Sequence, residues 1–299
     1  MEKKQIISKH GSSPLAGKVC LVTGATAGIG KITATALAAQ GATLVIHGRN
    51  RQKTEATVDE IRTKSGNDQV SCLLADFSDL DQVRDMAKTF QERFENLHLL
   101  LNNAGAFFNK RIPTPYGVEL TFLVNHLAPF LLTNLLLDPL KDSAPSRVIN
   151  VSSEAHRQDQ MDFENLDFKK GYFGIKAYAR SKLANILFTY ELARRLDGTG
   201  VVCNAVHPGH IATDIWKTNF GLIGPALKRI MGLFSLTPEE GAENSIYLAS
   251  SPKVEGISGK YFDKTEPTLS SDVSYDDEVS RALWDLSAEL TSLTGNQIE

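Results

Sequence analysis

The sequence predicts an α/β fold, with one doubly wound parallel sheet and helices on both of its faces. Short runs rich in β-branched and other apolar residues alternate with helical patterns along most of the chain. A glycine-rich turn joins the first predicted strand to the first predicted helix. The chain has 299 residues, of which 42% are hydrophobic and 22% charged, so it has ample material for a globular core.

The predicted strands are short apolar runs, beginning with KVCLVT and ending with GKYFD. They cover residues 18–23, 43–48, 70–76, 97–103, 147–153, 201–208 and 259–263. Helices are expected between them, at 29–40, 51–64, 79–94, 117–140, 176–196 and 238–250. This order predicts a single domain over residues 17–265, preceded by an N-terminal extension (1–16) and followed by a polar helical tail (266–299).

Two helix ends carry clear signals. Thr237, Pro238 and Glu240 have the pattern of a capping box with proline at the first helical position. Gly41 closes the first helix after Gln40. The segment 210–236 is a long excursion between a strand and a helix, rich in apolar residues and glycine. It predicts a flexible lid over an apolar substrate, and an ordinary packed helical insertion is the alternative.

Charge and cysteine content narrow the classes of function. The 32 basic and 35 acidic residues give a net charge of -3, which offers no electrostatic case for nucleic acid or an anionic membrane and favours small-molecule chemistry. The three cysteines lie in apolar runs without metal-ligand spacing, as expected of core residues in a reducing compartment. The N-terminal residues lack an apolar stretch long enough for a signal peptide or membrane anchor, so we expect a cytoplasmic protein with no metal site.

The glycine-rich turn VTGATAGIGK indicates a dinucleotide site. Gly24, Gly28 and Gly30 allow a tight turn and a close approach of the backbone to a pyrophosphate at the helix N-terminus. A nucleoside-triphosphate loop would need Gly at position 25 and Ser or Thr at position 32, where this chain has Ala25 and Ile32. The sequence therefore excludes that alternative.

The end of the second predicted strand indicates which dinucleotide binds. A carboxylate there would bind the adenosine ribose hydroxyls of NAD, but the strand ends with Gly48 followed by Arg49. An acid would repel a 2′-phosphate, whereas Arg can pair with it in a bidentate manner. We therefore expect NADP, with NADPH preferred over NADH. The alternative is that Arg49 is only a solvated turn residue.

Tyr178 and Lys182 lie four residues apart where a predicted helix begins. This spacing can bring an ammonium near a phenol. An adjacent positive charge would lower the pKa of the phenol and make it a usable proton donor.

Five motifs occur in one order along the chain: the glycine turn, LLLNNAG (99–105), INVSS (149–153), YARSK (178–182) and HPGHIAT (207–213). With them the chain resembles the short-chain dehydrogenase/reductase family over about residues 17–265, which implies a Rossmann fold. The longer strings YARSKLANILFTYELARRL, AVHPGHIATDI and EGISGKYFDK are most similar to the retinol dehydrogenase and retinal reductase branch. Since no N-terminal anchor is expected, the chain would depart from the membrane-bound members of that branch, which puts retinoids in doubt as substrates.

The resemblance implies a catalytic set. Tyr178 would be the general acid in carbonyl reduction and the base in alcohol oxidation. Lys182 would lower the pKa of Tyr178 and bind the nicotinamide ribose, and Ser153 would stabilise charge on the carbonyl oxygen, while Ser152 is structural. Asn125 would position a water molecule that leads from Lys182 to solvent. A solvent-facing Asn125 is the alternative.

The resemblance also implies the residues that bind the cofactor. Besides Tyr178 and Lys182, these are Gly24, Thr26, Ala27, Gly28, Ile29, Gly30, Arg49, Asp76, Asn103, Ala104, Gly105, Pro208, Gly209, Ile211 and Thr213. Asp76 would accept a hydrogen bond from adenine, with a helix N-cap as the alternative role. His207 is expected to be a packed, hydrogen-bonded residue. Family members often pair through the helices at 117–140 and 176–196, so a homodimer or homotetramer is expected by analogy.

The implied activity is NADP(H)-dependent interconversion of a lipophilic, retinal-like aldehyde or ketone and its alcohol. Two alternatives stay open at this point. One is a ketoreductase of the same family for a steroid or secondary metabolite. The other is a non-catalytic regulator that senses NADP(H) and acts through a partner protein.

Overall fold

The computed structural model describes residues 13–209 and 237–293. Its strands are β1 (Val19–Val22), β2 (Thr43–Gly48), β3 (Val70–Leu74), β4 (Leu99–Asn102), β5 (Ser146–Val151), β6 (Val201–His207), β7 (Lys260–Asp263) and β8 (Glu266–Thr268). Within these residues they form one sheet in the order β3-β2-β1-β4-β5-β6-β7-β8. All pairs are parallel except β7 with β8. The predicted fold class is confirmed, and β8 is an antiparallel edge strand that the sequence did not predict.

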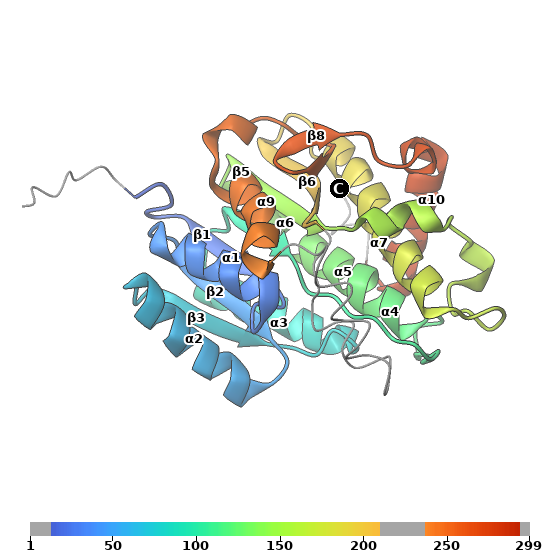
Figure 1. Ribbon diagram of the computed structural model, residues 1–299, viewed down its shortest axis with the longest axis horizontal. Coiled ribbons are helices and arrows are strands. Elements are labelled where there is room, and N and C mark those ends of the chain that lie inside the picture. Colours follow the sequence, from blue (N-terminus) through green and yellow to red (C-terminus); the bar gives the residue numbers. More distant parts are fainter. Residues whose placement is uncertain (1–12, 210–236, 294–299) are drawn as a thin grey trace, which may run out of the picture.

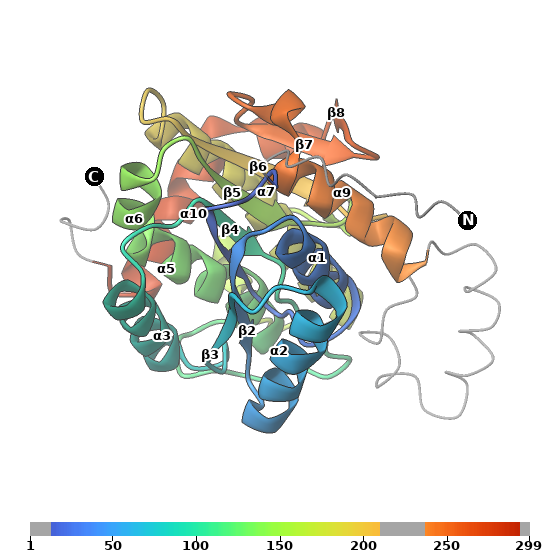
Figure 2. The same ribbon diagram turned by 90° about the vertical axis from the view of Figure 1, so that its left-hand side faces the viewer.

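Helices cover both faces of the sheet (Figures 1 and 2). The helices α1 (Gly28–Ala39), α2 (Arg51–Ser65) and α9 (Pro238–Ser250) lie on one face, and α3 (Leu80–Arg93), α5 (Ala128–Leu135) and α7 (Gly174–Arg195) lie on the other. Each face has its own hydrophobic core, because parallel strands bury side chains on both sides. The sheet order changes direction between β1 and β4, and a doubly wound sheet binds its ligand in the crevice at such a point.

The helix expected at 117–140 is broken, so that prediction is wrong in its continuity. The segment comprises α4 (Leu120–Phe122), the π-helical turn η1 (Leu123–Leu127), α5 and α6 (Leu137–Asp142). Two prolines explain the breaks, because a proline cannot donate to the carbonyl four residues earlier and its ring crowds that carbonyl. Pro129 has this effect on Asn125 inside η1, and Pro139 has it on Leu135, whose carbonyl accepts a hydrogen bond from the Gln91 side chain instead.

The predicted helix ends are confirmed. Thr237 caps α9 with a complete capping box, in which the Glu240 N–H donates to Thr237 Oγ1 over 3.2 Å and the Thr237 N–H donates to Glu240 Oε2 over 2.7 Å. Gly41 has a φ of +86°, in the region that favours glycine. Strand β5 ends at Val151, two residues earlier than expected, which leaves Ser153 free of the ladder.

The C-terminal residues do more than form a polar tail. The helix α10 (Asp277–Leu290) packs against α7 and buries Leu283 and Trp284. The Trp284 ring contacts the rings of Phe130 and Phe188, with centroid distances of 5.0 and 5.8 Å. Residues well beyond 265 therefore belong to the core of the domain.

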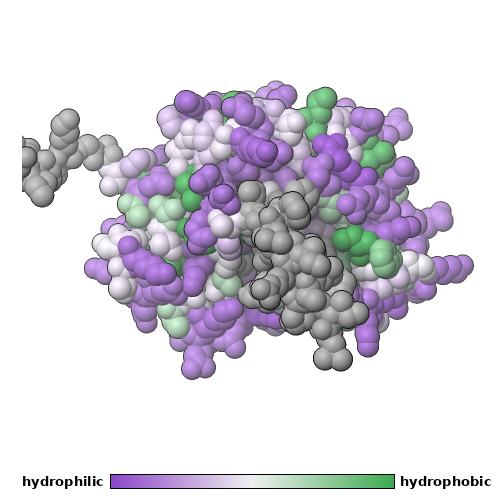
Figure 3. Space-filling model, in the orientation of Figure 1, coloured by the Kyte–Doolittle hydropathy of each residue, from purple (hydrophilic) through white to green (hydrophobic). Residues whose placement is uncertain are grey.

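The surface agrees with the mixed composition. The described part of the face in Figure 3 is mostly hydrophilic, with a few separated hydrophobic patches. No described helix has the length and apolar character needed to cross a membrane.

Candidate active site

The structure brings the four predicted catalytic residues together at the carboxyl ends of β4 and β5. Asn125 lies in η1, Ser153 follows β5, and Tyr178 and Lys182 lie in the first two turns of α7. Gly105 follows β4 and lies between two of them, because a Cβ on it would lie 3.5 Å from Asn125 Oδ1 and 3.6 Å from Lys182 Nζ. Tyr178 lies beside Lys182 and has a hydrogen bond with Ser153. Residues far apart in sequence therefore surround one small volume.

The Lys182 ammonium is fixed by the backbone of β5. Its Nζ donates to the Val151 carbonyl over 2.9 Å, and the side chain is buried. Its Nζ lies 5.5 Å from the centroid of the Tyr178 ring. Burial lowers the pKa of Lys182 to about 8, so part of the population is neutral near physiological pH.

The pKa of Tyr178 is not lowered as the sequence predicted, because the effect of burial is larger than that of the nearby Lys182 ammonium. Burial raises the pKa of Tyr178 to about 12, and a hydrogen bond with Ser153 opposes this increase. The physical reason is that burial disfavours the charged phenolate. Lowering the pKa of Tyr178 needs a further positive charge or hydrogen-bond donor, which a bound ligand can provide.

The two serines after β5 have different partners. Ser152 donates its hydroxyl to the Lys182 carbonyl over 2.8 Å and is buried, which agrees with the structural role expected for it. Ser153 caps the 3-10 helix η2 (Glu154–Gln158), and its Oγ accepts from the Ala155 N–H over 3.2 Å. The cap holds the hydroxyl of Ser153 beside Tyr178.

Asn125 is fully buried, which excludes the solvent-facing alternative. Its Oδ1 accepts from the Ala106 N–H over 2.7 Å, and its Nδ2 donates to the Ala106 carbonyl over 3.0 Å and to Ser181 Oγ over 2.9 Å. One side chain therefore ties the loop after β4 to the start of α7.

The glycine-rich turn packs tightly against the end of β4. Gly24 has a φ of +64°, and a Cβ on it would lie 2.7 Å from Ala104 Cα. A Cβ on Gly30 would lie 2.3 Å from Asn103 Nδ2, which donates to the Thr23 carbonyl over 2.8 Å. No side chain of the described part of the chain caps the N-terminus of α1. The N–H groups of its first turn thus face the turn, as a pyrophosphate site requires.

The end of β2 has no room for a carboxylate. A Cβ on Gly48 would lie 2.4 Å from Thr54 Oγ1 and 2.5 Å from Thr26 Cγ2. Arg49 is exposed, and none of the ion pairs within residues 13–209 and 237–293 uses it. By contrast, Lys31 forms an ion pair with Glu60, in which Nζ and Oε2 lie 3.0 Å apart.

The structure tests some of the predictions made for Asp76 and for the HPGHIAT motif. Asp76 Oδ1 accepts from the Ser78 N–H over 2.9 Å, while Asp79 is the N-cap of α3, so the N-cap alternative for Asp76 is wrong. Pro208 and Gly209 follow β6 as expected, and His207 is buried. The remaining predictions, for Ile211 and Thr213 and for the segment 210–236, fall outside the described residues.

Sequence reasoning missed the role of His47. Its Nδ1 accepts from the Gly24 N–H over 3.3 Å, its Nε2 contacts the Ala75 carbonyl over 3.0 Å, and its ring stacks on Phe77. Burial lowers its pKa to about 4, so the ring is neutral and supports the glycine-rich turn. A histidine inside an otherwise apolar strand was the available signal.

Phe107, on the loop after β4, was also missed. Its ring meets that of Tyr178 edge-on, with the centroids 6.0 Å apart. The aromatic pair that follows NNAG in the sequence was the available signal. Phe107 gives the site an apolar wall beside the candidate proton donor.

Comparisons with known proteins identify the family to which this chain belongs. The profile of the short chain dehydrogenase family matches residues 18–221. This chain belongs to the short-chain dehydrogenase family. Mouse retinol dehydrogenase 11 is 42% identical to this short-chain dehydrogenase over 279 residues, which cover 93% of the chain and 88% of the mouse protein. The resemblance to the retinol dehydrogenase branch is therefore confirmed.

Solved structures include proteins with the same fold as this chain. An uncharacterized protein from Mycobacterium paratuberculosis has a TM-score of 0.74 and 32% identity, covering 93% of this short-chain dehydrogenase and 94% of that protein. A short chain dehydrogenase from Burkholderia cenocepacia, solved in complex with NADP, has a TM-score of 0.66 and 28% identity, covering 83% of this chain and 96% of its own. The protein is an oxidoreductase of this family.

Proposed function

We propose that this protein interconverts a lipophilic aldehyde or ketone and the corresponding alcohol with NADP(H) as the hydride carrier. The observation that carries the proposal is the convergence of Asn125, Ser153, Tyr178 and Lys182 beside Gly105. These groups supply a proton donor, a hydrogen-bond donor for a developing oxyanion and a buried cation in one place.

The residues around the glycine-rich turn fit a dinucleotide. The uncapped first turn of α1 offers N–H groups to a pyrophosphate, and the close contacts of Gly24 and Gly30 leave no space for larger residues. A preference for NADP is supported by Gly48, where a carboxylate has no room, and by the exposed guanidinium of Arg49, which can pair with a 2′-phosphate. When bound, the reduced cofactor supplies the hydride for the carbonyl carbon.

Side chains of the protein donate the proton to the substrate oxygen and stabilise the charge that develops there. As the carbonyl oxygen gains electrons, Ser153 Oγ donates a hydrogen bond to it and the Tyr178 O–H bond breaks, so that the proton forms the new hydroxyl. The resulting phenolate is stabilised by the Lys182 ammonium, whose Nζ lies 5.5 Å from the centre of the phenol ring. Lys182 is held there by the Val151 carbonyl, so little reorganisation is needed.

A lipophilic substrate is supported by the relatives and by the site. Mouse retinol dehydrogenase 11 is named for an apolar alcohol. Phe107 adds an aromatic edge beside Tyr178. We therefore place retinal and medium-sized apolar aldehydes first among candidate substrates.

Tyr178→Phe tests the proposal. Oxidation of NADPH, with NADH in parallel, is followed by its near-ultraviolet absorbance while the protein is offered a panel of aldehydes and ketones that includes retinal. Turnover by the wild type is expected to fall at least about 100-fold in Tyr178→Phe, because general acid catalysis contributes at least that factor. Tyr247→Phe, a partly buried tyrosine of α9, is the control and should retain full activity. Tight binding of NADPH without turnover on any carbonyl would contradict the reductase function and favour the sensing regulator.

A further inference from the structure

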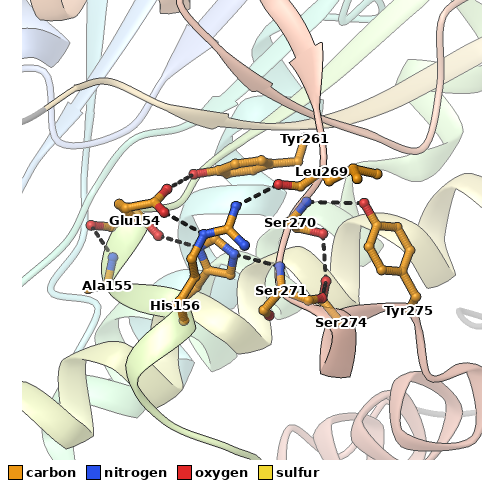
Figure 4. Close-up of polar contacts among 11 residues, drawn as sticks. Glu154, Ala155, His156, Tyr261, Leu269, Ser270, Ser271, Ser274 and Tyr275 are labelled. Carbon is orange, nitrogen blue, oxygen red and sulfur yellow. Dashed lines mark hydrogen bonds and ion pairs between the residues drawn. The ribbon is translucent and has the colours of Figure 1, made fainter.

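His156 connects the backbone of Ser153 to a segment more than a hundred residues later in the chain. The ring is fully buried, and it lies between η2 and the residues that precede the 3-10 helix η7 (Asp272–Tyr275), as Figure 4 shows. Its Nδ1 lies 2.7 Å from the Ser153 carbonyl oxygen, and its Nε2 lies 3.0 Å from the Ser271 nitrogen. Its ring also packs on Tyr261, with the centroids 5.1 Å apart.

The two contacts determine the protonation of the ring. A carbonyl can only accept a hydrogen bond, so Nδ1 must carry the proton that is donated to Ser153. A backbone N–H can only donate, so Nε2 must present a lone pair to Ser271. His156 is therefore neutral and held in one tautomer.

The segment that carries Ser271 is itself firmly attached to the domain. Its Leu269 carbonyl accepts from Arg157 Nη2 over 2.6 Å, and Ser270 Oγ lies 2.7 Å from the hydroxyl of Tyr190 on α7. The Ser270 N–H donates to the Tyr275 hydroxyl over 3.1 Å, on the side of Ser271 away from His156 in Figure 4. The Ser271 N–H is thus a fixed donor for His156.

We propose that His156 is a positioning residue for Ser153, and that the Ser271 N–H keeps it in the tautomer that holds the Ser153 carbonyl. The inference rests on the proposed function of Ser153 as a hydrogen-bond donor to the substrate oxygen. Ser152 and Ser153 link β5 to η2, and the Ser153 carbonyl accepts from the His156 backbone N–H over 3.0 Å as well as from the ring. A restraint on this carbonyl also restrains the direction of the Ser153 hydroxyl. The C-terminal segment thereby takes part in building the active site.

Protonation of His156 would set Nε2–H against the Ser271 N–H and push the ring away from its position, although Nδ1 would still carry its proton. Burial lowers the pKa of His156, and the charge of Arg157 acts in the same direction, whereas the Ser153 carbonyl and the Glu154 carboxylate oppose it. Among the described residues, Tyr261 packs on the ring, and burial raises the pKa of its hydroxyl, so it carries no charge in this pH range. We expect activity to decline on the acid side as His156 titrates.

Ser271→Pro and Ser271→Ala form a matched pair for the test. Ser271 has a φ of -68°, which proline adopts without backbone strain. Ser271→Pro removes the N–H donor and places the proline Cδ against His156 Nε2, so the ring must leave its position beside Ser153. Ser271→Ala retains the N–H and removes a hydroxyl that has no hydrogen-bond partner among the described residues. We expect kcat to fall about fivefold in Ser271→Pro, the value of one neutral hydrogen bond, with the KM for NADPH unchanged. Ser271→Ala should have the kcat of the wild type and the same KM for NADPH.

Two pH measurements separate positioning from a loss of packing. Without the opposing donor, protonation of His156 costs less, so its pKa and the acid limb of kcat should both rise in Ser271→Pro but not in Ser271→Ala. The pKa of His156 is read directly by NMR, with His156→Asn identifying its signal. His156→Asn can still donate to the Ser153 carbonyl and cannot titrate, so it should retain most of kcat and lose the acid limb.

Equal kcat and equal His156 pKa in the two Ser271 variants would overturn the inference. So would a His156→Asn variant that folds but retains the wild-type acid limb. If the wild type turned over no carbonyl, the proposed function would fail. The NMR comparison would then still decide the link, because an unchanged His156 pKa in Ser271→Pro would overturn it without any activity.

Discussion

Replacing Asn125 with alanine is expected to cost far more free energy of unfolding than the same change at a neighbouring buried asparagine. The change removes the partners of the Ala106 N–H and the Ala106 carbonyl, and Ser181 loses an incoming hydrogen bond. Ser181 keeps its own donor satisfied, because its hydroxyl donates to the Tyr178 carbonyl over 2.7 Å. Two backbone groups are therefore left unsatisfied, at about 1–3 kcal/mol each. We expect a loss of roughly 2–5 kcal/mol.

Asn134→Ala is the matched control. Asn134 is also buried, but its Nδ2 donates only to the Phe130 carbonyl within α5, over 2.8 Å, and its Oδ1 has no partner among the described residues. Removing an unsatisfied acceptor offsets the lost bond, so we expect a cost of about 1 kcal/mol or less. Equilibrium unfolding in urea, followed by circular dichroism, measures both variants.

The comparison also bears on activity. Ala106 follows Gly105, which lies against Lys182, so release of this loop should lower turnover in Asn125→Ala and leave Asn134→Ala unaffected. A free energy of unfolding for Asn125→Ala within about 1 kcal/mol of that for Asn134→Ala would refute the reasoning. It would mean that the three hydrogen bonds of Asn125 are readily replaced by water.

Three other changes test the cofactor site, the buried lysine and the C-terminal helix. Arg49→Gln should weaken NADPH binding by roughly 10- to 100-fold, the value of a charge-assisted hydrogen bond, without affecting NADH binding. Fluorescence titration with each cofactor measures this, and equal losses of affinity for NADPH and NADH would contradict it. The pKa of Lys182 is lowered to about 8, so above that pH the folded cofactor-free protein binds fewer protons than the unfolded chain. Its free energy of unfolding should therefore rise by about 2 kcal/mol from pH 8 to pH 10, relative to that of Lys182→Met. Urea unfolding at the two pH values measures the difference, and a parallel response of the two proteins would argue against a buried ammonium. Trp284→Ala should lower the free energy of unfolding by about 3–5 kcal/mol, and Trp284→Phe by much less, since the indole N–H has no partner among the described residues. Equal melting temperatures for Trp284→Ala and the wild type would show that α10 does not stabilise the core.

Much of the fold was determined by local patterns in the sequence. Apolar runs of strand length alternate with helical patterns, and the structure contains each of the seven strands expected from them. Local signals also specified the capping box at Thr237 and the glycine-rich turn, because caps and tight turns depend on residues a few positions apart. The same holds for Tyr178 and Lys182, which helical spacing alone brings onto one face.

Only the tertiary structure decided how these pieces act on one another. The sequence shows Asn125 in an apolar helix, but its partners at Ala106 and Ser181 depend on how η1 packs between the loop after β4 and α7. The pKa of Tyr178 is raised rather than lowered, because burial in the folded protein outweighs the proximity of Lys182 along the helix.

The contact between His156 and Ser271 spans 115 positions, and no local pattern encodes it. Periodicity reports which face of an element is buried, whereas contacts between distant segments depend on how those faces pack in three dimensions. The sequence by itself therefore determined the elements, the glycine-rich turn and the candidate proton donor. The packing of distant segments determined the polar network that holds them in place.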